Sequence, residues 1–322
     1  MDWLIEPFAL GFQQRALVGG LVAAVMCSVV GVWLVLRGMS FFGDAFVHGV
    51  IPGIAAAVLF GFSPYAGAAV AAAAMVGGMQ LVYRTTTLKE DTSIGLLFVG
   101  MMALGVVIIS RSESYTGSLT AILFGDALGV TWADIRIQSV LAVVVVLFAA
   151  LLYRPLMALS FSPAKARSLG LHPRLTHGLL LVLIATAVIG SFQAVGTMLV
   201  FGLLVGPPAT AALVSRSVPA MFAWSVGIAM ASVAVGLSLS YHWGTAGSAT
   251  MALTPIVLFF VVLAVREAVR VLRRRSGRRG GGRGVLAPEI AAPGPAVPAS
   301  VAPGGSAPGP VAAPRPAGEV GP

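Results

Sequence analysis

The stretch ALVGGLVAAVMCSVVGVWLVL occupies residues 16–36 and contains no charged residue. It is long enough to cross a bilayer, whose hydrocarbon core takes about 20 helical residues. The run is also longer than the apolar core of about 7–15 residues in a secretory signal, and no small-residue cleavage site closes it. The stretch therefore predicts a transmembrane helix that is retained. Its Cys27, the chain's single cysteine, is best explained as a small packing residue.

Similar apolar stretches follow one another as far as residue 265, and they decide the fold class. Because hydrocarbon offers no partner for free backbone amides, each stretch must be a helix. The chain is therefore predicted to be an all-α, polytopic transmembrane bundle. We expect nine spans, at about 16–36, 45–61, 64–83, 94–110, 133–153, 177–191, 194–214, 219–239 and 248–266. The number falls to eight if the sixth and seventh join around Gly190–Gly196, and Leu119–Phe124 is expected to be re-entrant or interfacial.

The composition supports a membrane location and argues against a soluble protein. Of the 322 residues, 58% are hydrophobic and only 10% are charged, and the mean hydropathy is +0.96. The net charge of +9 comes largely from arginines that crowd just after the last span. A basic cluster there indicates topology and a contact with anionic lipid, and nucleic acid is not an expected partner. We divide the chain into a transmembrane domain, 1–266, and a basic, then Gly/Pro/Ala-rich disordered tail, 267–322.

The distribution of basic residues predicts the orientation in the plasma (inner) membrane. With the N-terminus outside, 17 of the 20 lysines and arginines fall in inside loops or in the tail. Only Arg15, Arg111 and Arg136 are then outside. Since inside loops are enriched in basic residues, we expect an outside N-terminus and a cytoplasmic C-terminus.

Asp44 and His48, at the head of the second span, are the strongest candidates for chemistry. They are i and i+4, so on a helix both side chains project from one face. A carboxylate and an imidazole at this spacing suit a divalent ion such as Zn²⁺ or Mn²⁺. The alternative is that the aspartate caps the helix and the histidine bonds to a neighbouring helix. His172 and His177 are expected to be solvated, and His242 to belong to an interfacial aromatic cluster.

Two further features concern helix shape and the inside loops. Glycines and prolines are expected to kink the spans or to allow close packing, at Pro52, Gly53, Gly206, Pro207 and Pro208. In the longest inside loop, Ser162–Pro163 resembles a helix start, Ala164–Leu169 a short amphipathic helix and Gly170 its stop. Because so short a helix is marginal in water, it is expected to dock against a cytoplasmic protein or the membrane surface.

Neither lysine belongs to a phosphate-binding loop, so the chain is not expected to hydrolyse ATP by that route.

Four motifs in register resemble the metal-specific permease family of ABC importers, which serves zinc, manganese and iron uptake. They are Leu34–Ala45 with His48 and Pro52–Gly53, Lys89–Gly95, the loop Ser162–Gly170, and Leu203–Ala211. The resemblance covers about residues 8–266 and looks closest to zinc-type members. One departure is that family members often have an acidic residue where Ser162 or Pro163 stands.

The resemblance implies a permease subunit that is not itself an enzyme and has no permanently bound cofactor. It implies a homodimer that works with a cytoplasmic ABC ATPase and an extracellular or periplasmic metal-binding protein, by alternating access. Asp44 and His48 would line the ion path, with zinc favoured over manganese or iron. The ATPase-coupling residues would be Ser162, Ala164, Lys165, Ala166, Leu169 and Gly170.

Three other function classes compete with this interpretation. A secondary metal-ion transporter or channel would work without an ATPase, but it would need further buried acids along a proton relay. A membrane-embedded enzyme would need a fuller set of ligands than four histidines scattered over separate segments. A permease for an organic metal chelate would not need a carboxylate–imidazole pair.

Overall fold

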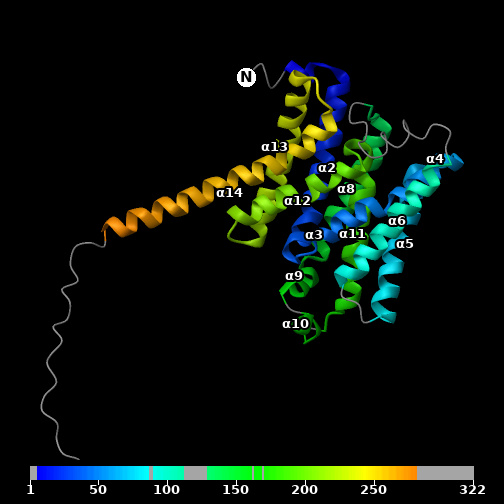
Figure 1. Ribbon diagram of the computed structural model, residues 1–322, viewed down its shortest axis with the longest axis horizontal. Helices are drawn as coiled ribbons and strands as arrows, with labels where there is room; N and C mark the ends of the chain where they lie inside the picture. The colour runs from blue at the N-terminus through cyan, green and yellow to red at the C-terminus, as the bar shows by residue number, and fades with distance from the viewer. Residues whose placement is uncertain (1–5, 87–89, 112–128, 162, 169, 281–322) are drawn as a thin grey trace, which may run out of the picture. The chain divides into compact units, whose positions relative to one another are not determined.

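The structure is a computed structural model that describes residues 6–86, 90–111, 129–161, 163–168 and 170–280. All regular structure in these residues is helical, so the predicted fold class is confirmed (Figure 1). After the short turn η1 (Glu6–Ala9) the order is α2 (Gly11–Leu36), α3 (Ser40–Gly49), α4 (Ile51–Phe60), α5 (Pro64–Thr85), α6 (Glu90–Ile109), α8 (Trp132–Leu151), α9 (Tyr153–Phe161), α10 (Pro163–Ser168), α11 (Pro173–Val195), α12 (Thr197–Val214), α13 (Val218–Trp243) and α14 (Gly247–Gly280). The predicted segment Leu119–Phe124 lies outside the described residues.

Eight helical segments of the described chain are long and apolar enough to cross a membrane, which confirms the lower of the two predicted numbers. α3 and α4 together make one of them, Ser40–Phe60, with 21 residues. α12 is not counted, because its apolar part, Val200–Val214, is shorter than a span. The number eight thus has a different origin from the merger considered above, since α11 and α12 remain separate helices. Gly196 divides them with φ at +85°, a value that residues with a side chain rarely adopt.

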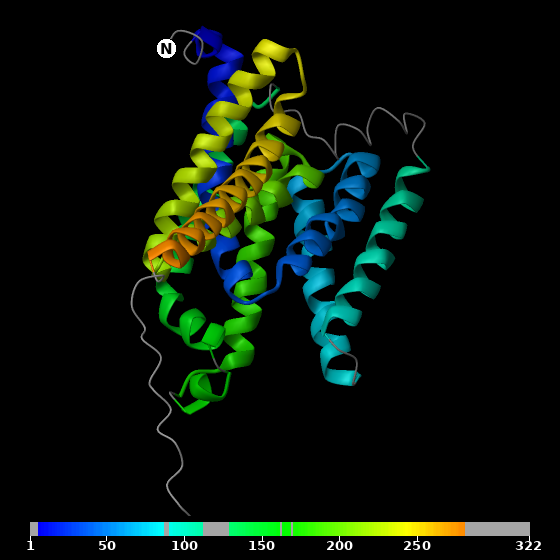
Figure 2. The same ribbon diagram turned by 60° about the vertical axis from the view of Figure 1, so that its left-hand side comes forward.

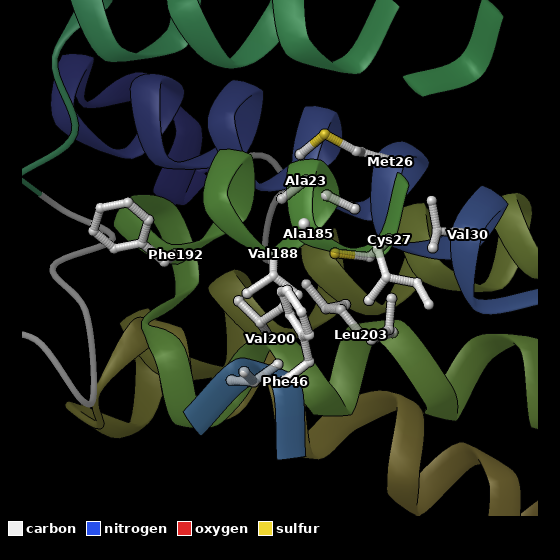
Figure 3. Packing of buried hydrophobic residues seen from close by; sticks show 14 of the residues in the cluster. Ala23, Met26, Cys27, Val30, Phe46, Ala185, Val188, Phe192, Val200 and Leu203 are labelled. Carbon is white, nitrogen blue, oxygen red and sulfur yellow. The ribbon is translucent and has the colours of Figure 1, made fainter. Parts of the chain in front are cut away.

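α2 is the central helix of the larger group, which also contains α8, α11, α12 and α13. Figure 3 shows where α2 meets α11, α12 and α3. The side chains that gather there are all apolar and buried: Met26, Cys27, Val30, Phe46, Ala185, Val188, Val200 and Leu203. Between helices in lipid, such contacts stabilise mainly through van der Waals packing, because the lipid tails are as apolar as the side chains.

Gly31 lets α2 approach α12 at the point where two prolines interrupt the backbone bonding of α12. Pro208 has no N–H, so the carbonyl of Leu204 loses its usual partner four residues on. Gly31 packs directly against that carbonyl, and a β-carbon at residue 31 would overlap both the Leu204 oxygen and the Pro208 ring. The Gly206–Pro208 segment is therefore accommodated by a glycine on the facing helix.

α4, α5 and α6 form a second group of closely packed helices. Gly53 of α4 and Gly67 of α5 face each other so closely that a β-carbon on either would overlap the backbone oxygen of the other. α3 lies between the two groups, packed on α6 at one side and on α12 at the other. The helix that carries Asp44 and His48 therefore lies at the interface between these two groups of helices.

The two ends of the bundle carry different elements. The start of α2 and the turn between α13 and α14 lie at one end, while α9 and α10 lie at the other (Figure 2). α14 continues past residue 266, the predicted end of the last span, to Gly280. Residues up to Arg273 belong to the helical bundle, and the chain from Arg274 onward forms a separate unit.

Candidate functional site

α3 begins after a tight turn and is amphipathic. Gly38, with φ at +66°, separates the end of α2 from the start of α3. One face of α3 is buried in the bundle and includes Phe42, Gly43, Ala45, Phe46 and Val47. Phe41, Asp44 and His48 recur at intervals of three and four residues, so they share the opposite face. These three side chains are only partly buried or exposed.

Asp44 and His48 meet on this face, as their spacing predicts. The imidazole Nε2 lies 3.7 Å from the Asp44 Oδ1, and the side chains are 14% exposed for His48 and 34% for Asp44. This separation is too long for a hydrogen bond. The other imidazole nitrogen, Nδ1, is buried and has no hydrogen-bond partner among the described residues. The pair is thus held close by the helix itself and is not locked together.

The geometry permits both side chains to bind one metal ion. Two bonds of about 2.1 Å that meet at a metal can join atoms up to about 4.2 Å apart, so a single ion can reach both atoms across the measured 3.7 Å. Two ligands do not complete a coordination sphere, however. The described residues contain no group of three or more His, Cys, Asp and Glu side chains that could hold a metal. The described residues of one chain therefore place two candidate ligands together on this face.

The helix that carries the pair is interrupted directly after it. α3 ends at Gly49 and α4 starts at Ile51, and Pro52 lies in the first turn of α4. A proline in the first helical turn costs no hydrogen bond, because the amides there have no partner within the helix. Gly49, next to His48, packs against the Met75 sulfur so tightly that a β-carbon there would overlap it. The interruption and the close contact fix where α3 stops.

The remaining histidines do not join the pair. The exposed His172 precedes α11 as its N-cap residue and makes no side-chain cap bond. The His242 Nδ1 lies 2.8 Å from the Ser238 carbonyl, and its ring contacts the Tyr241 ring edge-on, in agreement with the expected aromatic cluster. His177 differs from expectation, because it is partly buried in α11 and not simply solvated.

His177 makes a contact that sequence reasoning missed. The Arg37 Nη1 lies 3.0 Å from the His177 Nδ1 and joins the end of α2 to the start of α11. A guanidinium nitrogen can only donate, so Nδ1 accepts this bond. The two residues are 140 positions apart, and nothing in their local sequence links them.

The predicted loop helix is present as α10. It begins at Pro163, and Gly170 follows it with φ at +72°, in agreement with the expected start and stop. Ala166 is buried at 1% exposure, and the backbone of Ala164 and Lys165 is helical. Ser162 and Leu169 lie outside the described residues. α10 packs on α9 and α11 and occupies the end of the bundle opposite the start of α2 (Figures 1 and 2).

Comparison with known proteins gives a family and several relatives. A sequence profile described as "ABC 3 transport family" matches residues 9–266. The manganese transport system membrane protein MntC of Listeria innocua is 34% identical over 251 residues, which is 78% of this chain and 89% of the relative. The chelated iron transport system membrane protein YfeD of Yersinia pestis is 33% identical over 270 residues, 84% of this chain and 90% of the relative.

A solved structure agrees with the same assignment. A chain of PsaBC from Streptococcus pneumoniae, determined in complex with Fab, superimposes with a TM-score of 0.74 and 29% identity. The match covers 81% of this chain and 94% of that one. The Listeria and Yersinia relatives are named for manganese and for chelated iron, respectively, and neither is named for zinc.

Proposed function

Since this chain belongs to the ABC 3 transport family, it is the membrane permease of an ABC metal importer, and we propose that Asp44 and His48 bind the ion in transit. The observation that carries this proposal is the approach of an imidazole and a carboxylate on a partly exposed face of α3, 3.7 Å apart. Removing a divalent ion from water is prohibitive unless such ligands replace its hydration shell.

We propose that the permease is a homodimer whose second copy completes the site. One chain offers two ligands, and the described residues contain no larger cluster. Two copies facing each other through α3 would offer two carboxylates and two imidazoles, enough for a four-coordinate or higher site. Asp44 is 34% exposed in the single chain, so its carboxylate is open to such a partner.

The transported ion is proposed to be a divalent first-row metal. The resemblance of the sequence favoured zinc, whereas the relatives are named for manganese and iron. Carboxylate oxygen suits Mn²⁺, and imidazole nitrogen suits Fe²⁺ and Zn²⁺, so the donor types accept all three. Transport measurements must therefore first establish which of these three ions the permease transports most efficiently.

The proposed cycle is alternating access driven by a separate ATPase. An external metal-binding protein delivers the ion, and the Asp44–His48 pairs hold it while the cavity changes sides. The cytoplasmic ATPase acts on α10, a short helix at the bundle end opposite the start of α2 (Figure 2). This assignment places the N-terminus outside and α10 in the cytoplasm, in accord with the basic residues of the inside loops.

The test is uptake of labelled Mn²⁺, Fe²⁺ and Zn²⁺ into proteoliposomes containing this chain, its ATPase and its metal-binding protein. Asp44→Asn and His48→Ala are compared with Asp134→Asn and His172→Ala as matched controls. Asp134 accepts a hydrogen bond from Thr131 in a capping box at the start of α8, and asparagine can retain that role. The exposed His172 makes no side-chain cap bond.

The proposal expects ATP-dependent uptake that is lost in both site variants and kept in both controls, while every complex still assembles. Uptake that continues without ATP would favour a secondary transporter or channel. Unchanged uptake in Asp44→Asn and His48→Ala would reduce the pair to structural residues.

A further inference from the structure

Phe98 of α6 is the aromatic side chain that contacts the imidazole of His48. The two ring centroids are 5.6 Å apart and the planes meet at 63°, an edge-on arrangement. The same Phe98 ring also contacts Phe41 edge-on, with the centroids 6.4 Å apart. Phe98 itself is partly buried and packed against the main apolar core. One side chain from α6 therefore touches the exposed face of α3 at two points.

These two points lie on either side of Asp44. Phe41 and His48 are seven residues apart, which is two helical turns and about 10 Å along α3. Asp44 lies between them, three residues after Phe41 and four before His48. The Phe98 ring thus lies beside the turn that carries the carboxylate. The Asp44 side chain is 34% exposed and Phe41 is 50% exposed, so Phe98 leaves this face of α3 partly accessible.

No hydrogen bond from the described residues fixes the imidazole of His48. Its Nδ1 has no partner among the described residues, and its Nε2 is 3.7 Å from the carboxylate. Histidine ligands usually donate their second ring nitrogen to an oxygen that holds the ring in place. Here the observed constraint on the ring plane is the edge-on packing against Phe98. Such aromatic pairs prefer this geometry because the ring faces and edges carry opposite partial charge.

We propose that Phe98 is a positioning residue for metal binding, which holds the His48 imidazole with Nε2 directed toward Asp44. This proposal rests on the proposed function of the Asp44–His48 pair and extends it to a residue on a different helix. Because Phe98 is on α6 and the pair is on α3, the orientation of the ligand depends on how these two helices pack. A change in the α3–α6 contact therefore changes the affinity for the ion.

Substitutions at residue 98 distinguish an effect of the aromatic ring from an effect of apolar volume alone. Phe98→Leu keeps an apolar side chain and loses the ring, whereas Phe98→Tyr keeps the ring. Phe192→Leu is the matched control, because Phe192 pairs edge-on with Tyr65 at 5.5 Å and 66°, a similar contact outside the site. All variants are studied in the full complex with its ATPase and metal-binding protein. Binding of Mn²⁺, Fe²⁺ and Zn²⁺ to the complex and the KM and maximal rate of uptake are measured for each.

Phe98→Leu is expected to weaken metal binding and raise the KM for uptake by about tenfold, the lower end of the range for groups that orient metal ligands. The maximal rate and the thermal stability of the complex should change little, and Phe98→Tyr should behave like the wild type. Phe192→Leu should leave metal affinity unchanged.

Three outcomes would overturn the inference: unchanged affinity in Phe98→Leu, an equal loss in Phe98→Tyr, or an equal loss in Phe192→Leu. The proposed function has a separate test. If Asp44→Asn abolishes uptake and Phe98→Leu does not alter affinity, the ion site stands and the role of Phe98 is wrong. If Asp44→Asn has no effect, the site itself is wrong.

Discussion

Two contacts, each between a histidine and a charged residue, lie near the turn between α2 and α3, and they differ in the charge of the partner and in hydrogen bonding. His48 faces a carboxylate four residues away on its own helix, at 3.7 Å and partly exposed. His177 accepts a bond at 3.0 Å from the guanidinium of Arg37, which comes from another helix 140 positions away. One pair therefore presents negative charge to an ion, and the other presents positive charge.

This contrast suggests different roles for the two pairs, one in binding the ion and one in holding helices together. A divalent ion can bind between Asp44 and His48 without breaking a hydrogen bond, since none joins the two side chains. Arg37 and His177 already satisfy each other, and a guanidinium repels a metal ion. The second pair instead connects the end of α2, only seven residues before Asp44, with the start of α11. We therefore expect the first pair to control transport and the second to control the packing of the bundle.

The largest effect is expected from reversing the charge of the first pair. Asp44→Lys replaces an attractive carboxylate with an ammonium group, so ATP-dependent metal uptake should fall at least about a hundredfold. Arg37→Lys, which keeps its charge at the second pair, should retain most of the uptake. The measurement is the initial rate of metal uptake in proteoliposomes, with assembly checked by size-exclusion chromatography. Equal loss in the two variants would remove the distinction between the pairs.

The next effect concerns the packing of α2, the helix that ends at Arg37, against α12. Gly31→Ala places a β-carbon against the Leu204 carbonyl and the Pro208 ring, so α2 must move away from α12. Overpacking of this kind costs about 1–3 kcal/mol of stability. The melting temperature of the purified permease should fall accordingly. Gly77→Ala is the matched control, because a β-carbon at residue 77 of α5 meets nothing within 4 Å.

Most of the fold could be predicted from the sequence, because hydrocarbon allows few alternatives. Apolar runs of span length must be helices, and each of the eight long segments overlaps an expected span. The ninth expected span, 194–214, corresponds to α12, whose apolar part Val200–Val214 is too short. The expected spans 177–191 and 194–214 already separate α11 from α12, but α11 runs on to Val195 and the break lies at Gly196, because periodicity does not show at which residue two adjoining apolar helices divide. The continuation of α14 to Gly280 was missed because arginine is a good helix former, whereas composition alone suggested a tail.

The candidate site was predictable only where its geometry is local. Asp44 and His48 meet because residues four apart on any helix are neighbours. Phe98 and the Arg37–His177 contact were not predictable, since each depends on how separate helices pack. Gly31 was equally unpredictable. It packs against the Leu204 carbonyl on α12, and no local pattern in α2 predicts that contact. Sequence periodicity places residues on faces, and packing decides which faces meet.

A smaller effect is expected from removing the Arg37–His177 contact. A double-mutant cycle with Arg37→Gln and His177→Gln measures how much the two side chains stabilise each other. Because one partner is charged and the contact is partly buried, we expect a coupling free energy of about 1.5 kcal/mol. The cycle is measured by thermal denaturation of the permease in detergent. A coupling of zero would mean that the contact does not hold α2 to α11.

The smallest effect is expected for the Asp44–His48 pair when no metal is present. The two groups are too far apart for a hydrogen bond, and Asp44 is 34% exposed, so solvent screens their interaction. A cycle with Asp44→Asn and His48→Gln should therefore give a coupling below about 0.5 kcal/mol in metal-free buffer. Adding Mn²⁺, Fe²⁺ or Zn²⁺ should raise the coupling, because an ion that binds only the folded protein stabilises it in proportion to its affinity.

The same metals should leave the Arg37–His177 coupling unchanged, which makes that pair the internal control for this measurement. A metal-dependent coupling confined to Asp44 and His48 would identify them as ligands independently of any transport assay. Coupling that is already strong without metal would instead indicate a structural ion pair. The comparison of the two pairs would then no longer distinguish an ion site from a packing contact.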